Sequence, residues 1–231
     1  MSTVGIIGGI GPESTIEYYR KIISAYLKSN ANGNYPRIII NSINMTKMLD
    51  LIANNQLEQV SAYLASEVRK LSEAGADFGV LASNTPHIVF NEVQRATSLP
   101  LISIVEAADK SITSTGLHRV GLFGTKFTMQ GGFYDEVLRA HNIVVITPDD
   151  IDQDYIHEKY MGELVKGVIL DETRSGLLRV IDKMKHRQNI QGLILGGTEL
   201  PLILSKNDMP DLHLFDTTEI HVESILQIMG N

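Results

Sequence analysis

Short apolar runs alternate along the chain with longer stretches of helical periodicity. This alternation is typical of β-strand and α-helix pairs built around a parallel sheet. The runs predicted as strands cover residues 4–7, 37–43, 78–82, 101–105, 120–123, 143–146, 193–195 and 212–215. The pattern therefore predicts an α/β fold with eight strands.

Between these runs, apolar residues recur at helical spacing and predict amphipathic helices. We expect four buried helix faces. They are Ile16, Tyr19, Ile23, Tyr26 and Leu27; Leu57, Val60, Leu64, Val68 and Leu71; Leu177, Leu178, Ile181 and Met184; and Ile220, Ile225, Leu226 and Met229.

Two pairs of segments resemble each other at nearly constant spacing. VGIIGG at 4–9 resembles VGLFGT at 120–125, and FGVLASNT at 78–85 resembles GLILGGT at 192–198. Chance similarity of apolar strands would explain either pair alone, but two pairs in matching order favour a duplication. The sequence thus predicts two similar halves related by a pseudo-twofold axis and facing each other.

Ligands of parallel α/β sheets bind beyond the carboxyl ends of the strands. The predicted strand ends read GGIG at 8–11, NSIN at 41–44, SNT at 83–85, GT at 124–125 and GTE at 197–199. Small, hydroxyl and amide residues let a carboxylate approach backbone N–H groups. The same residues also serve as helix N-caps, and both interpretations stay open.

Composition and charge narrow the choice of ligand. The 231 residues include 20 basic and 27 acidic side chains, a net charge of -7, which argues against nucleic acid or an anionic membrane surface as the main partner. The absence of cysteine excludes disulfides, thiolate metal sites and thiolate nucleophiles. The first residues lack a basic region and a long apolar run, so we expect a cytoplasmic protein that takes a small molecule.

Other motifs are weak. GIGPES at 9–14 approaches the dinucleotide fingerprint, but Ser14 replaces its third glycine and no acidic residue ends the second strand. The seven histidines show no metal-ligand spacing. We therefore expect neither a cofactor nor a metal. Ser83 with His87 as its base lacks the flanking glycines of a hydrolase elbow. Lys166 is a lone cation near the end of a predicted helix, where the helix dipole favours it.

The chain resembles the pyridoxal-phosphate-independent aspartate/glutamate racemases over its whole length. The resemblance implies two α/β domains of four parallel strands each, residues 1–100 with 213–231 and residues 101–212, with the substrate enclosed between them, and it implies a homodimer. The matching segments are IIGG at 6–9, EST at 13–15, YY at 18–19, NTPH at 84–87, GLFGTKFTM at 121–129, TEL at 198–200, LFDTT at 214–218 and IH at 220–221.

The resemblance also implies roles for individual residues. Each half of such an enzyme supplies one thiol, and these catalytic positions correspond to Ser83 and Gly197. One thiolate removes the α-proton while the other thiol protonates the opposite face of the carbon. The substrate carboxylates would be bound by Gly9, Asn84, Thr85, Thr125, Lys166, Thr198 and Glu199.

Serine and glycine cannot perform the two-thiol chemistry, so three functions are considered for the chain. In an isomerase acting on aspartate or glutamate, Glu199, His87 or an ordered water would replace a thiol. An inactive family member would bind an acidic amino acid or small dicarboxylate, and a lyase or hydrolase using Ser83 is a remote third reading. If the scaffold is preserved, we expect Ser83→Cys with Gly197→Cys to create or raise racemase activity.

Overall fold

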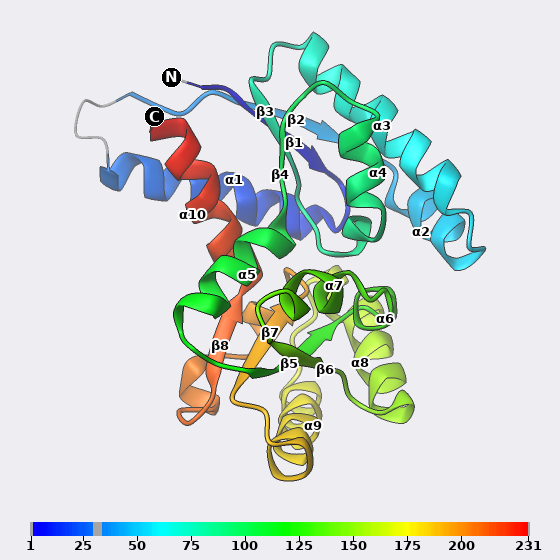
Figure 1. Cartoon of the computed structure of the whole chain (residues 1–231), viewed down its shortest axis with the longest axis vertical. Helices are drawn as coiled ribbons and strands as arrows, with labels where there is room; N and C mark the ends of the chain where they lie inside the picture. Colours follow the sequence, from blue (N-terminus) through cyan, green and yellow to red (C-terminus); the bar gives the residue numbers. More distant parts are fainter. Residues whose placement is uncertain (1, 30–33, 231) are drawn as a thin grey trace. The chain divides into compact units, whose positions relative to one another are not determined.

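The computed structural model describes residues 2–29 and 34–230 (Figure 1). Its tertiary contacts group the chain into two units. The first unit contains the residues up to Ile104 together with those from Thr218 onward, and the second contains Val105–Thr217. The domain ends expected from the sequence, at 100 and 212, lie a few residues before the ends of these units.

The first unit is built on a parallel sheet with strand order β2-β1-β3-β4. The central strand β1 pairs with β2 and β3, and Val4 is in register with both Ile38 and Phe78. The elements are β1 (Val4–Gly8), α1 (Pro12–Ser29), β2 (Ile38–Ser42), α2 (Met45–Ala53), α3 (Leu57–Glu73), β3 (Phe78–Leu81), the 3-10 turn η1 (Thr85–Val89), α4 (Phe90–Arg95), β4 (Leu101–Ile102) and α10 (Thr217–Gly230).

Helices cover both faces of this sheet, as a parallel sheet requires. Helices α1 and α10 pack on one face, where their side chains form a core with Val4, Ile6 and Val80. On the other face α3 lies close to Gly5, because a Cβ there would lie 2.9 Å from Ala76 Cβ and 3.0 Å from Leu71 Cδ1. Because helices fill both faces of the sheet, a ligand can approach it only at the ends of the strands.

The predicted face of α3 is confirmed, whereas that of α1 is partly wrong. Ile16 and Tyr19 are 57% and 49% exposed. The buried face of α1 instead includes Ser14 and Tyr18. Their polar atoms are satisfied, because Ser14 Oγ donates to the Ala82 carbonyl at 2.8 Å and Tyr18 Oη bonds His221 Nδ1 at 2.8 Å. The spacing of apolar residues along the sequence cannot reveal such hydrogen-bond partners, which lie far away in the chain.

Strand β4 is shorter than predicted, because the run at 101–105 changes to helix within itself. Only Leu101–Ile102 forms strand, and α5 (Ile104–Ser114) begins two residues later. The N–H of Ile104 donates to His87 Nε2 at 3.1 Å instead of to a sheet neighbour. This bond accounts for the early end of the strand.

The second unit is built on a sheet with order β6-β5-β7-β8. Its central strands β5 and β7 end together, since Gly124 is in register with Gly196. The elements after α5 are β5 (Arg119–Gly124), α6 (Lys126–Gln130), α7 (Phe133–Arg139), β6 (Val144–Ile146), α8 (Asp150–Gly162), the 3-10 turn η2 (Leu164–Lys166), α9 (Asp171–Gln188), β7 (Gly192–Gly196), the 3-10 turns η3 (Leu200–Leu202) and η4 (Lys206–Asp208), and β8 (His213–Asp216).

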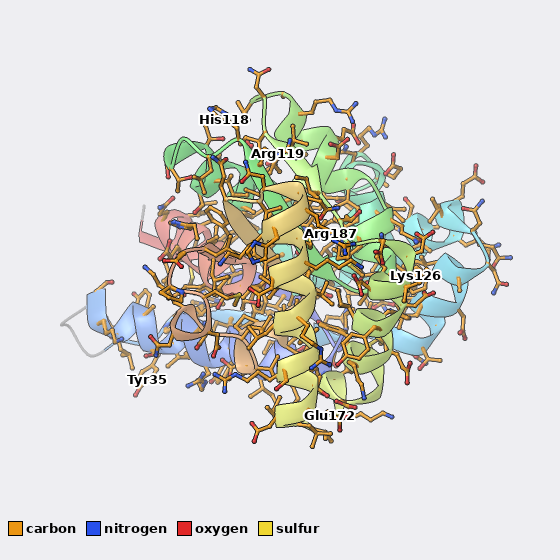
Figure 2. The ribbon with its side chains drawn as sticks, turned by 90° about the horizontal axis from the view of Figure 1, so that it is seen from below. Tyr35, His118, Arg119, Lys126, Glu172 and Arg187 are labelled. Carbon is orange, nitrogen blue, oxygen red and sulfur yellow. The ribbon has the colours of Figure 1, made fainter. Side chains whose placement is uncertain are left out.

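Helices α8 and α9 bury their apolar faces against Phe123 and Leu195 of this sheet. The predicted stripe of α9 is confirmed, with Leu177, Ile181 and Met184 buried. Figure 2 shows Glu172 and Arg187 towards opposite ends of α9. Acidic residues in its first turn and basic residues in its last complement the helix dipole.

All eight predicted strands are present, and the predicted fold class of two four-stranded parallel sheets flanked by helices is confirmed. The two sheets also share one strand order. The segment pairs that resemble each other in sequence become β1 with β5 and β3 with β7, which are the central strands of the two sheets.

Candidate functional site

The first strand end is a tight glycine turn between β1 and α1. Gly9 has a φ of 77°, and a Cβ there would lie 2.5 Å from the Ile43 carbonyl oxygen. Both facts demand glycine. The Gly9 N–H donates to Thr15 Oγ1 at 2.9 Å. The backbone donor expected to bind a substrate carboxylate is thus hydrogen-bonded within the turn.

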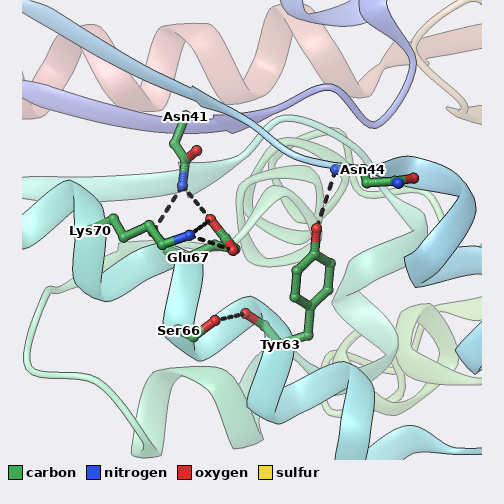
Figure 3. Close-up of polar contacts among 6 residues, drawn as sticks. All are labelled: Asn41, Asn44, Tyr63, Ser66, Glu67 and Lys70. Atoms are coloured by element: carbon green, nitrogen blue, oxygen red, sulfur yellow. Dashed lines mark hydrogen bonds and ion pairs between the residues drawn. The ribbon is translucent and has the colours of Figure 1, made fainter.

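The polar residues at the carboxyl end of β2 and just after it form hydrogen bonds within the first unit (Figure 3). Asn41 Nδ2 donates to Glu67 Oε2 at 2.8 Å, and Lys70 Nζ donates to the same carboxylate at 2.8 Å. Burial raises the pKa of Glu67, but the bonds from Lys70 and Asn41 outweigh it and leave that pKa below its usual value. Asn44 caps α2 by accepting from the Lys47 N–H at 3.2 Å. At this strand end the capping interpretation is correct.

At the end of β3, Ser83, Asn84 and Thr85 follow one another, with Ser83 partly exposed and the other two buried. Ile7 of β1 is in register with Leu81, so Gly9 and Ser83 lie at the same edge of the sheet. Within the part of the chain that the structure describes, the Ser83 hydroxyl has no hydrogen-bond partner. A hydroxyl without an adjacent base is a poor nucleophile and a poor proton acceptor.

His87 cannot act as that base, because both of its ring nitrogens are engaged in hydrogen bonds. Its Nε2 accepts from the Ile104 N–H at 3.1 Å, and its Nδ1 lies 3.0 Å from the Ser83 carbonyl oxygen. An imidazole that accepts at Nε2 must donate at Nδ1. Burial, reinforced by the nearby His221, lowers the pKa of His87 to about 3. His87 is therefore a neutral structural residue, neither the base of a hydrolase nor a substitute for a thiol.

Thr125 lies at the end of β5 and caps α6. Its Oγ1 accepts from the Thr128 N–H at 3.2 Å and lies 3.1 Å from the Thr128 hydroxyl. Lys126 beside it contacts α8, where its N–H donates to His157 Nδ1 at 3.2 Å and its ammonium pairs with Asp154. Because Gly124 and Gly196 are in register, Thr125 lies next to the residues that follow β7.

The end of β7 contains a buried hydrogen-bonded cluster. Thr198 and Glu199 are 5% and 1% exposed. Thr198 Oγ1 donates to Glu199 Oε2 at 2.8 Å, and Tyr160 Oη of α8 donates to the same oxygen. Burial and the Glu199 charge raise the pKa of Tyr160 well above its usual value. The phenol thus remains protonated at neutral pH.

Tyr160 is a site residue that sequence reasoning missed. The sequence held a partial signal, since Gln153, Ile156 and Tyr160 follow helical spacing and form the buried face of α8. Periodicity predicts that such a tyrosine is buried. It does not say that the ring ends beside Gly197, because that contact joins residues far apart in the sequence.

Lys166 lies in η2, after α8 has ended at Gly162. It is exposed, and it forms no ion pair with any residue in the described part of the chain. It thus lies near the end of α8, as expected, but in the 3-10 turn that follows Glu163. An exposed, unpaired ammonium is chemically suited to a carboxylate.

Among residues 2–29 and 34–230, no three histidine or acidic side chains gather closely enough to hold a metal ion. No helix there combines the length and the apolar character needed to cross a membrane.

Comparisons with known proteins agree on one family. The model of the Asp/Glu/hydantoin racemase family matches residues 7–225. The chain is 30% identical over 193 residues to the broad specificity amino-acid racemase RacX of Bacillus subtilis, a match that covers 82% of this chain and 75% of RacX.

Solved structures show the same fold over the full length. The Asp/Glu racemase candidate of Yersinia pestis superposes with a TM-score of 0.90 at 34% identity and covers 100% of both chains. An aspartate racemase homologue from Pyrococcus horikoshii OT3 has a TM-score of 0.85, also at 34% identity and 100% coverage of both chains.

Proposed function

Because the chain belongs to the Asp/Glu/hydantoin racemase family, we propose that it binds aspartate or glutamate and exchanges the proton on the α-carbon without a cofactor. One observation carries the proposal. The family match includes every polar strand end, and Asn84, Thr85, Thr198 and Glu199 are all buried there. Ligands of parallel α/β sheets bind beyond the carboxyl ends of the strands, so polar residues gathered at these ends favour a ligand-binding role.

Acidic amino acids suit these groups chemically. Their carboxylates accept hydrogen bonds from hydroxyl, amide and backbone N–H donors, and a cation adds a charge-assisted bond. Asn84, Thr85, Thr125 and Thr198 are the neutral residues proposed to contact the carboxylates, and Lys166 is the proposed cation. Exchange at the α-carbon additionally requires a group that takes a proton and returns one.

Proton exchange can be measured directly. We expect that incubating each enantiomer of aspartate and glutamate with the protein in deuterium oxide places deuterium at the α-carbon of at least one of them. Mass spectrometry detects the gain of one mass unit, and heat-denatured protein is the control. If calorimetry demonstrates binding but no enantiomer gains deuterium, the proposed exchange is wrong.

A second candidate is a binding protein without turnover. Two observations favour it: the Ser83 hydroxyl has no bonded base among the described residues, and Gly197 has no side chain. This candidate predicts saturable binding of an acidic amino acid or small dicarboxylate with no exchange. The deuterium experiment combined with calorimetry separates the two candidates.

Replacing Lys166 tests the proposed anion partner. A charge-assisted hydrogen bond contributes about 1.5–3 kcal/mol, so Lys166→Gln should weaken binding of aspartate at least about tenfold. Lys110→Gln is the matched control, because Lys110 is also exposed but lies on α5 and has no proposed ligand role. Equal affinities of the two variants in calorimetry would remove Lys166 from the site.

A further inference from the structure

The space at Gly197 is already occupied by another residue. A Cβ built on Gly197 would lie 2.4 Å from Cε2 of Tyr160 and 2.9 Å from its Cζ and Oη. Gly197 does not have a left-handed backbone, since its φ is not among the positive values. Glycine is therefore required here by space, because the phenol of Tyr160 fills the volume that a side chain at position 197 would take.

The phenol is fixed in this place by its surroundings. Tyr160 is 5% exposed and packs in the core formed by α8, α9 and the second sheet. Its hydroxyl donates to Glu199 Oε2, which also accepts from Thr198 Oγ1. A hydroxyl and a carboxylate thus form one hydrogen-bonded pair at the carboxyl end of β7, immediately beside Gly197.

We propose that Tyr160 and Glu199 together transfer the α-proton, at the strand end where the family resemblance implies a thiol on residue 197. The inference rests on the proposed function. As the Cα–H bond breaks, Tyr160 Oη accepts the proton and passes its own proton to Glu199 Oε2. The electron pair stays on the α-carbon as a carbanion, and Glu199 becomes a neutral acid. The reverse transfer restores the amino acid.

The environment suits this division of roles. The raised pKa of Tyr160 keeps the phenol protonated, so it acts as the relay while the carboxylate acts as the base. Hydrogen bonds are stronger in a buried, low-dielectric place, and such a chain polarises its members. Glu199, one of the residues considered as a thiol substitute, therefore acts through Tyr160.

The test compares variants that keep the shape of the side chains but remove the groups proposed to transfer the proton. Tyr160→Phe removes only the hydroxyl, and Glu199→Gln removes the base while keeping an acceptor for the phenol. Positioned proton transfer contributes about 100- to 10,000-fold, so both variants should lose at least about 100-fold in α-deuterium incorporation. Tyr155→Phe is the control, since it removes a hydroxyl from the same helix on the side that packs against Gly176.

Thermal unfolding and calorimetric titration with aspartate are measured on the same samples. They establish that each variant is folded and binds aspartate. The expected result is retained binding with lost exchange for Tyr160→Phe and Glu199→Gln, and wild-type exchange for Tyr155→Phe. Folded, aspartate-binding Tyr160→Phe that exchanges at the wild-type rate overturns this inference alone. A wild-type protein that binds but exchanges no proton overturns both the inference and the proposed function.

Discussion

Replacing Gly197 with cysteine is expected to destabilise the protein by about 1–3 kcal/mol, as overpacking of a well-filled core does. The new Cβ would lie 2.4 Å from Cε2 of Tyr160, and that ring is buried and hydrogen-bonded to Glu199. The ring therefore cannot yield without breaking its own contacts. Urea unfolding of the wild type, Gly197→Ala and Gly197→Cys measures the cost, and Gly197→Ala isolates the contribution of the Cβ.

A second substitution identifies the cause of this cost. Leucine lacks the Cε2, Cζ and Oη atoms that crowd position 197, so Tyr160→Leu should make Gly197→Ala much less costly. Tyr160→Phe keeps the Cε2 atom, so it should leave the cost of Gly197→Ala nearly unchanged. Sites that share a contact show coupling of about 0.5–3 kcal/mol in a double-mutant cycle. Additive effects of Gly197→Ala and Tyr160→Leu would show that Tyr160 does not occupy this space.

The same contact bears on the double variant Ser83→Cys with Gly197→Cys, which on a preserved scaffold is expected to create or raise racemase activity. A side chain at position 197 meets the ring of Tyr160 at 2.4 Å. The thiol therefore fits only if that ring moves, or if residue 160 is made smaller.

Lowering the pH from 8 to 5 is expected to destabilise the protein by about 4 kcal/mol through two buried histidines. Burial lowers the pKa of His87 to about 3 and that of His221 to about 4. Both histidines are neutral in the folded state, whereas in the unfolded state they become protonated below a pKa of about 6.5. Stability is thus complete above pH 6.5 and is lost as the pH falls towards 4 and 3, by about 2 kcal/mol per histidine at pH 5.

The pH window distinguishes the histidines from the carboxylates, which titrate mainly below pH 5. The free energy of unfolding in urea, measured at intervals from pH 8 to 5, should fall with the slope of nearly two protons near pH 5. His221→Gln should reduce that slope by about one proton. A slope equal to the wild-type one in His221→Gln would contradict the assignment.

The periodicity of the sequence predicts the eight strands and the face of α3, because those patterns arise from local burial. It fails on α1, where Tyr18 is buried because His221, 203 residues away in the sequence, bonds its hydroxyl. It also extends β4 too far, because His87 captures the Ile104 N–H. In both cases a polar partner distant in sequence decides the structure.

The candidate site shows the same division. The strand ends are predictable because parallel strands place their carboxyl ends at one edge. The choice between capping and ligand binding is not, and the structure assigns capping roles to Asn44 and Thr125. The role of Tyr160 cannot be predicted from the sequence either. The need for glycine at position 197 arises from the Tyr160 ring of α8, which lies beside it only in the folded chain.

The stereochemistry of exchange tests the central claim most directly. A single proton-transfer pair, Tyr160 with Glu199, contacts one face of the α-carbon and returns a proton to the face from which it took one. In deuterium oxide, α-deuterium incorporation into one enantiomer of aspartate or glutamate should therefore proceed faster than the other enantiomer appears, as measured by chiral chromatography with mass detection. Equal rates of exchange and inversion from either enantiomer would show two equivalent acid–base groups and contradict the account.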